Sequence, residues 1–156
     1  MSKPYKLKNP NEVRNQIERT TDRLGMPVDK GILRSVVILN SLGFNTSGSC
    51  EGHEERYNTS PWIDLKFSDA ESIESAKEIF FATLFKDLEE FYQNRKVLHE
   101  IKIIFREIKS TSYIVRLCSN SNLKIFDRER ELHLREQFLE LTDFCEFLNH
   151  KYKLNY

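Results

Sequence analysis

One short segment of the chain, residues 46–53, gathers most of the side chains that could do chemistry. It reads Thr-Ser-Gly-Ser-Cys-Glu-Gly-His, which combines a thiol, an imidazole, a carboxylate and three hydroxyls with two glycines. A thiolate is the strongest nucleophile among side chains, and a neighbouring imidazole can lower the pKa of its thiol. Cys50 and His53 are therefore the candidate catalytic residues, with His53 as the base that would activate Cys50.

The same two residues also have structural interpretations. Cys50 could be a small buried residue at the end of a strand, and His53 a loop histidine bonded to a backbone carbonyl. Their spacing matches half of many zinc sites, but no second pair follows in the sequence, so no structural zinc site is predicted. A catalytic metal held by Cys50, His53 and a carboxylate such as Glu51, Glu54 or Asp64 is an alternative. The sequence does not identify a cofactor.

Five residues are candidates for contacts with a substrate. Thr46 and Ser49 could donate hydrogen bonds to an anionic ligand or could satisfy backbone groups of the turn. Glu51 makes the segment locally acidic, which favours a cation, a sugar or a base edge over a phosphate. Trp62 and Asp64 could stack on and hydrogen-bond a ring, although a neighbouring helix could equally cover Trp62.

Length and composition indicate one folded domain over residues 1–156. Apolar residues make up 39% and charged residues 31% of the chain, and the two kinds are interspersed, as in a protein with one core. The three widely spaced cysteines, Cys50, Cys118 and Cys145, predict reduced thiols. We expect a cytoplasmic protein with no membrane partner, because the sequence contains neither a bilayer-length apolar run nor a signal-peptide pattern at its N-terminus.

The formal net charge is zero, which argues against broad, nonspecific nucleic-acid binding through phosphate neutralisation. Residues 51–90 are acidic, whereas residues 1–34 and 95–135 lean basic. A basic surface could meet phosphate locally, but solvated helix and strand surfaces are the simpler interpretation.

The residue patterns predict an α+β fold in the order α-α-β-β-α-β-β-α, with a four-stranded antiparallel or mixed sheet backed by helices. After an extended segment over residues 1–10, Asn11 is expected to cap a first helix ending at Gly25. Asp29 is expected to cap the second helix, and Gly43 to close it.

A capping box over residues 68–71 predicts a third helix to about Asn94, and the final helix is expected from Asp127 to Tyr152. The expected buried residues of the third helix are Ile73, Phe80, Leu84, Leu88 and Phe91, and those of the last are Leu134, Phe138, Leu141, Cys145, Leu148 and Tyr152.

Residues 61–67 alternate as a half-buried strand does. Ile63 and Leu65 are expected to face the core, with Trp62 and Asp64 on the other face, beside the Cys50 segment. Two further strands are expected over residues 98–107 and 113–118.

Residues 24–67 resemble a family of uncharacterised bacterial proteins that share a Ser-Cys-Glu-Gly-His motif. The resemblance rests on the stretches Leu-Gly-Met-Pro-Val-Asp-Lys-Gly-Ile (24–32), Leu-Asn (39–40), residues 46–53 and Pro-Trp-Ile-Asp (61–64). More distantly, the segment is similar to one in the wybutosine-synthesis methyltransferase family, whose members modify transfer RNA with S-adenosylmethionine. That family's motif reads Ser-Cys-Ser-Gly-Arg, so Glu51 and His53 replace its serine and arginine, and the arginine's cation is lost.

Two hypotheses about function follow. In the first, the protein is an enzyme acting on a nucleotide-like or nucleic-acid-derived small molecule at the loop of residues 46–53, with Cys50 and His53 at its centre. In the second, it is a binding or regulatory module that uses the same loop without breaking a bond.

Overall fold

The computed structural model of the chain describes residues 5–20, 27–52, 60–67, 71–96, 101–108, 110–120 and 127–156, with side chains from residue 132 onward in the last range. The elements follow the predicted order, with α3, η1 and α4 together forming the third helix. The helices are α1 (Pro10–Glu18), α2 (Leu33–Ser41), α3 (Ile73–Phe80), the π-helical turn η1 (Phe81–Phe85), α4 (Lys86–Gln93) and α5 (Asp127–Lys151). The strands are β1 (Asn45–Cys50), β2 (Trp62–Lys66), β3 (Ile103–Ile108) and β4 (Ile114–Ser119).

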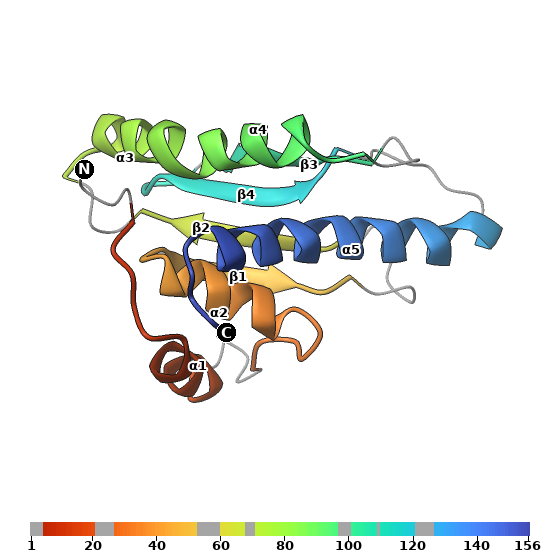
Figure 1. Cartoon of the computed structure of the whole chain (residues 1–156), viewed down its shortest axis with the longest axis horizontal. Helices are drawn as coiled ribbons and strands as arrows, with labels where there is room; N and C mark the ends of the chain where they lie inside the picture. Colours follow the sequence, from red (N-terminus) through yellow and green to blue (C-terminus); the bar gives the residue numbers. More distant parts are fainter. Residues whose placement is uncertain are drawn as a thin grey trace.

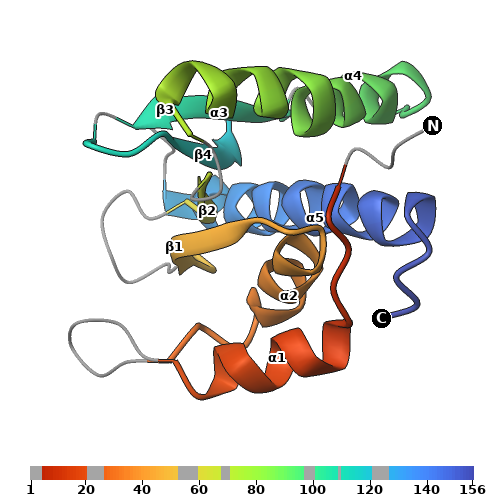
Figure 2. The same cartoon turned by 90° about the vertical axis from the view of Figure 1, so that its left-hand side faces the viewer.

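The four strands form one antiparallel sheet in the order β1-β2-β4-β3 (Figure 1). Helices α2 and α5 and the α3–α4 helix all lie on one side of this sheet, and α1 packs beneath α2 (Figure 2). Among the described elements, none of the helices lies against the opposite side. We call that side the helix-free face; its strands carry Cys50, Trp62, Asp64, Lys66, Arg106, Arg116 and Cys118.

The core lies between the sheet and the helices. Ile63, Leu65 and Leu117 of the central strands are fully buried, as are Phe144 and Leu148 of α5. Because successive side chains of a strand point to opposite faces, burying Ile63 and Leu65 places Trp62 and Asp64 on the helix-free face. The prediction for this strand is confirmed.

Helix α5 is the longest element and runs across the middle of the sheet (Figure 1). Its buried residues include the predicted Leu141, Cys145 and Leu148, together with the carboxylate of Glu140. Arg95 and Tyr92 donate hydrogen bonds to Glu140, so this buried charge is paired. Within the described chain, none of the helices combines the length and apolar character needed to span a bilayer.

The ends of the first two helices differ in part from the predictions. Asn9, and not Asn11, caps α1: its Oδ1 accepts hydrogen bonds from the N–H groups of Asn11 (2.9 Å) and Glu12 (3.2 Å). Pro10 then occupies the first helical position, which its fixed φ favours. Gly43 ends α2 with φ +101°, as predicted. The predicted end of α1 at Gly25 is wrong, because the helix ends at Glu18 with Arg19 as its C-cap; Gly25 itself lies outside the described residues.

The third helix begins later than predicted and is not regular. Ser72 caps it by accepting a hydrogen bond from the N–H of Ser75 (3.1 Å), and residues 68–70 lie outside the described chain. The turn η1 interrupts the α-helical pattern that was expected to be continuous. Ile73 was predicted to be buried, but it is 50% exposed. It is the first residue of α3 and is not one of the residues of the core cluster.

The alternative caps of α1 give a direct test. Replacing Asn9 with alanine removes the side chain that accepts from two free N–H groups, so we expect Asn9→Ala to lower the free energy of unfolding by about 1 kcal/mol. Asn11→Ala is the matched control and should change it by less than about 0.5 kcal/mol, because Asn11 lies inside the helix, where alanine is favoured. Urea denaturation of both variants measures the difference. Equal losses would show that Asn9 is not the cap.

Candidate functional site

The segment expected as a loop over residues 46–53 is mostly a strand. Residues 46–50 belong to β1, an edge strand that pairs with β2, and residues 51 and 52 follow it. His53 lies outside the described residues, so its predicted role as the base for Cys50 stays a prediction. Glu54, an alternative metal ligand, lies outside them as well.

The register of β1 divides the candidate residues between two faces of the sheet. Thr46 lies opposite Leu65 and Ser49 opposite Ile63, and both partners face the helices. Cys50 lies opposite Trp62, on the helix-free face. The predicted substrate contacts therefore do not converge on one surface.

A β-bulge between Thr46 and Gly48 turns Thr46 toward the helices. An extra residue in one strand reverses the side-chain alternation on one side of it. Without the bulge, Thr46 would share a face with Cys50. With it, Thr46 meets helix α2, where Asn40 Nδ2 donates hydrogen bonds to the Thr46 hydroxyl (3.2 Å) and to the Val36 carbonyl (2.8 Å).

Glu51 closes the end of β1 onto the segment before α2. Its carboxylate accepts a hydrogen bond from the N–H of Gly31 (2.7 Å), and its own N–H donates to the carboxylate of Asp29 (3.2 Å). This second bond overturns the predicted cap, because α2 begins at Leu33 with Ile32 as its N-cap and without a side-chain cap. Asp29 and Glu51 thus join two segments that are about twenty residues apart in the sequence.

Three side chains on the helix-free face form a stacked and hydrogen-bonded group. Arg116 Nε and Nη2 donate to the two carboxylate oxygens of Asp64, at 2.7 and 3.0 Å. The guanidinium also lies over the Trp62 ring, with its central carbon 4.2 Å from the ring centroid. The hydrogen bonds to Asp64 raise the pKa of Arg116 further above its ordinary value, so the guanidinium stays charged.

The Trp62 ring leans toward β1, where Gly48 leaves room for it. A Cβ atom at Gly48 would lie 3.2 Å from two carbons of the indole ring, which is closer than ordinary van der Waals contact. Trp62 therefore lies between a strand backbone and the Arg116 guanidinium. A covering helix was the alternative raised for Trp62, but no described helix lies against this face of the sheet (Figure 2).

Arg116 is the functional candidate that sequence reasoning missed. Its signal was present: Val115 and Leu117 are apolar and buried, so alternation places Arg116 on the other face. Its pairing with Asp64 depends on the register between β2 and β4, since the two residues are far apart in the sequence. Arg106 of β3 lies directly opposite Arg116 and extends the row.

The three cysteines have different environments. Cys50 is half-buried, and its sulfur accepts a hydrogen bond from the N–H of Gly52 (3.4 Å). Cys118 is buried, and so is Cys145, as predicted for the last helix. Burial raises the pKa of the Cys118 thiol, and the positive charges of Arg106 and Arg116 partly offset this increase. Burial raises the pKa of Cys145 to about 12.

Within the described part of the chain, no three His, Cys, Asp or Glu side chains lie close enough together to hold a metal ion. A metal site that includes His53 or Glu54 falls outside that part. Of its other suggested ligands, Asp64 has both oxygens bonded to Arg116, and Glu51 is bonded to Gly31.

Comparison of the chain with protein-family models, with curated proteins and with solved structures finds no match. The resemblance to the Ser-Cys-Glu-Gly-His family and to the wybutosine-synthesis methyltransferases therefore stays a prediction.

The contact between Gly31 and Glu51 predicts a thermodynamic coupling. A Cβ atom at Gly31 would lie 2.2 Å from Glu51 Oε2, so Gly31→Ala displaces the carboxylate and should cost about 1 kcal/mol of stability through the lost hydrogen bond. In a Glu51→Ala background, Gly31→Ala should cost almost no stability, because the carboxylate that the new Cβ atom would displace is absent. Urea denaturation of the four proteins measures the coupling. Additive costs would contradict the Gly31–Glu51 contact.

Proposed function

We propose that the helix-free face, beside the Cys50 end of β1, binds a nucleotide-like ligand, in which an aromatic ring is joined to an anionic group. The observation that carries this proposal is the arrangement of Arg116, which is fixed by Asp64 and stacked on Trp62. An arginine fixed in this way is preorganised to meet an anion, because its side chain loses little further freedom on binding.

The charges of the helix-free face support an anionic ligand. The strands place three basic side chains there, Lys66, Arg106 and Arg116, against the single carboxylate of Asp64. Asp64 is already neutralised by its two hydrogen bonds from Arg116. This local excess of positive charge exists even though the whole chain has a net charge of zero, and it favours phosphate at this face and not along the entire surface.

The aromatic part of the ligand is supported by Trp62 and by the guanidinium stacked on it. Bases stack on aromatic rings and on guanidinium planes, and each such contact stabilises binding without requiring one particular base. In this proposal Asp64 has a different role from the one first expected: both of its oxygens bind and position Arg116, and Arg116 makes the direct contact with the ligand.

Trp62 is the only tryptophan of the chain, so its fluorescence reports on this face alone. We expect ribonucleoside 5′-monophosphates to quench it saturably, and inorganic phosphate or the free nucleosides to do so only weakly, since each offers half of the recognised groups. Arg116→Lys keeps a cation beside Asp64 but loses the planar fork and the stacking, and should weaken nucleotide binding about tenfold or more.

Arg135→Lys is the matched control for that titration, because Arg135 is exposed on α5, and it should leave the affinity unchanged. Short single-stranded RNA, titrated in parallel, distinguishes a free nucleotide from a nucleic-acid-derived ligand. If no nucleotide or RNA quenches Trp62, or if Arg116→Lys binds as well as the wild type, the proposed function is wrong.

The position of Cys50 favours a second, catalytic candidate. Cys50 is the one half-buried thiol of the three, and it lies directly opposite Trp62 on the helix-free face. A ligand held against Trp62 and Arg116 would therefore lie beside a nucleophile. In this version Cys50 is the nucleophile and His53 is the base that accepts its thiol proton, as the sequence predicts.

Thiol labelling separates the two versions. At pH 8 in the folded protein we expect one fast-reacting thiol, Cys50, which Cys50→Ser removes. Cys145 should react only after unfolding, because burial raises its pKa to about 12 and so suppresses the thiolate at pH 8. A catalytic Cys50 requires a labelling rate that stays high below about pH 7.5. A rate that is low there and still rises at pH 9 leaves binding as the function.

A further inference from the structure

Four phenylalanine rings meet between the π-helical turn η1 and the outer strand β3. Phe81 and Phe85 belong to η1, Phe80 directly precedes it, and Phe105 lies on β3. The centroid of the Phe80 ring lies 5.2 Å from that of Phe81 and 6.1 Å from that of Phe85. It lies 4.8 Å from the centroid of the Phe105 ring. We call these four residues the phenylalanine cluster.

The π-helical geometry of η1 helps to assemble this cluster. Residues five apart are separated by about 140° around a regular α-helix, so Phe80 and Phe85 would point in different directions there. In a π-helix the backbone hydrogen bond joins residues five apart, which brings their side chains toward the same side. Such turns occur frequently at functional sites. The irregularity of the third helix therefore directs its aromatic side chains toward one place.

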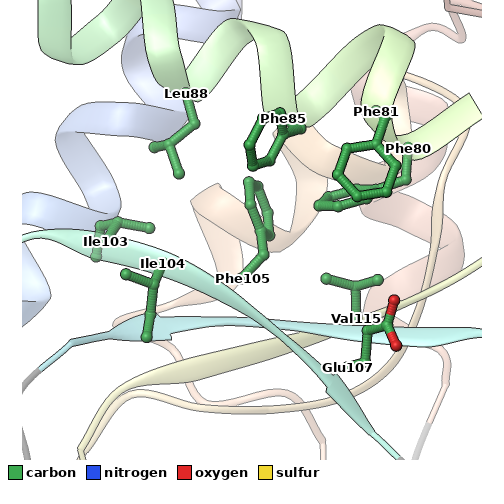
Figure 3. A pocket seen from close by; sticks show the side chains of 9 residues that line it. All are labelled: Phe80, Phe81, Phe85, Leu88, Ile103, Ile104, Phe105, Glu107 and Val115. Carbon is green, nitrogen blue, oxygen red and sulfur yellow. The ribbon is translucent and has the colours of Figure 1, made fainter. Parts of the chain in front are cut away.

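A cavity of about 380 Å³ opens beside the phenylalanine cluster. Figure 3 shows the three helical phenylalanines pointing toward β3, and Phe105 pointing from β3 toward the helix. Ligand sites for small molecules usually have volumes of about 300–1,000 Å³, and this cavity falls within that range. Phe81 and Phe85 are 49 and 37% exposed, so solvent reaches its mouth. The aliphatic residues that line it are Leu88, Ile103, Ile104 and Val115.

Among the described residues that line the cavity, Glu107 alone is charged. Strand alternation places it on the same side of β3 as Phe105. Its Oε1 accepts a hydrogen bond from the Tyr113 hydroxyl (3.2 Å) and lies 3.8 Å from the Lys77 ammonium. Both contacts use Oε1, so within the described chain Oε2 has no hydrogen-bond or ion-pair partner. The cavity thus combines aromatic rings with an available negative charge.

The rings of the phenylalanine cluster also differ from other aromatic rings of the protein. Elsewhere in the described chain, lysine or arginine side chains lie 6.0 Å or less from the centroids of these rings: Trp62, Phe91, Tyr92, Tyr113, Phe147, Tyr152 and Tyr156. None of the cations in the described residues lies over a ring of the cluster. Because the face of an aromatic ring attracts a cation, the cluster offers faces that the described chain leaves unused.

We propose that this cavity binds a small organic cation, in which a quaternary ammonium group is attached to an apolar body. The ammonium group lies between Glu107 Oε2 and the rings of the cluster, and the apolar body fills the cavity toward Leu88 and Ile103. A fully alkylated ammonium has no N–H group to donate, so ring faces and a carboxylate are the groups that recognise it. This site is on the helix side of the sheet and does not depend on the nucleotide site of the helix-free face.

Charge complementarity favours a cation over the other possible occupants. The Glu107 carboxylate repels an anion, and an uncharged apolar molecule would take water from Oε2 without replacing its hydrogen bonds, which costs free energy. Lys77 already uses the same attraction, because its ammonium lies near Glu107 and 5.9 Å from the centroid of the Tyr113 ring. The Lys77–Glu107 pair is about half exposed on both sides and is therefore weak.

The test is a calorimetric titration of the full chain with phenyltrimethylammonium, accompanied by amide NMR spectra. We expect saturable binding that shifts the amide signals of Phe105 and Glu107. tert-Butylbenzene has the same shape without the charge and should bind at least about threefold more weakly. Glu107→Gln removes the charge and keeps the size of the side chain, so it should weaken binding of the cation by about fivefold or more.

Glu12→Gln is the matched control, because it makes the same change in charge on exposed α1, on the other side of the molecule (Figure 1). It should leave the affinity unchanged. Phe81→Leu keeps an apolar wall but removes a ring, and should weaken binding of the cation by about threefold or more. Lys77→Met removes the ammonium that competes for Glu107, so it should strengthen binding of the cation about twofold or more.

The three wild-type titrations decide the proposal even if a variant does not fold. No binding of phenyltrimethylammonium up to about 10 mM would overturn it. Equal or tighter binding of tert-butylbenzene would show a purely apolar pocket. Tighter binding of benzenesulfonate, lost in Lys77→Met, would show an anion site instead. The nucleotide proposal is read separately from Trp62 fluorescence on the helix-free face, so either proposal can fail without the other.

Discussion

The one-sided covering of the sheet is the constraint on which the other features of this protein depend. Helices α2 and α5 and the α3–α4 helix all lie on the same face of the sheet, so each strand must alternate between a residue for the core and a residue for the other side. The core residues Ile63, Leu65 and Leu117 and the site residues Trp62, Asp64 and Arg116 are two halves of the same alternation. Shifting any central strand by one residue would exchange them.

This constraint also explains why the site depends on an arginine–carboxylate pair. Asp64 is 9% exposed, and a carboxylate so far out of water requires a partner. Arg116 supplies both hydrogen bonds from the neighbouring strand, and Trp62 covers one side of its guanidinium. Asp64 and Trp62 together therefore hold the Arg116 guanidinium in place before any ligand binds. A mobile lysine at the same position would have to be ordered on binding, at a cost in affinity.

The parts of the fold that depend on local pattern could be predicted, and the parts that depend on distant pairing could not. Alternation over residues 61–67 correctly assigned the faces of β2, and Gly43 correctly marked the end of α2. Asp29 has the type and position of a helix cap, but its carboxylate accepts from Glu51, whose approach is set by the path of β1. The local sequence around Asp29 does not predict its contact with Glu51.

The same limit applies within the candidate site. Thr46 and Ser49 were grouped with Cys50 because they are neighbours in the sequence. Ordinary alternation places Ser49 toward the helices and Cys50 away from them, and the bulge in β1 places Thr46 on the same side as Ser49. Arg116 could be assigned to the correct face by alternation, but its contact with Asp64 follows only from the register of β4 against β2. The π-helical turn η1 likewise leaves no signal in the spacing of apolar residues.

The two edges of the sheet differ in a way that separates their roles. At β1 the ladder is interrupted by the bulge, the residues are small and polar, and Glu51 turns the chain toward Gly31 immediately afterwards. Bulged and short edges of this kind resist pairing with other strands. At β3 the ladder is continuous and the strand carries Ile103, Ile104, Phe105 and Ile108. The irregularity that shapes the candidate site thus also protects that edge, whereas at the β3 edge the hydroxyl of Tyr92 from α4 accepts the hydrogen bond of the Ile103 N–H.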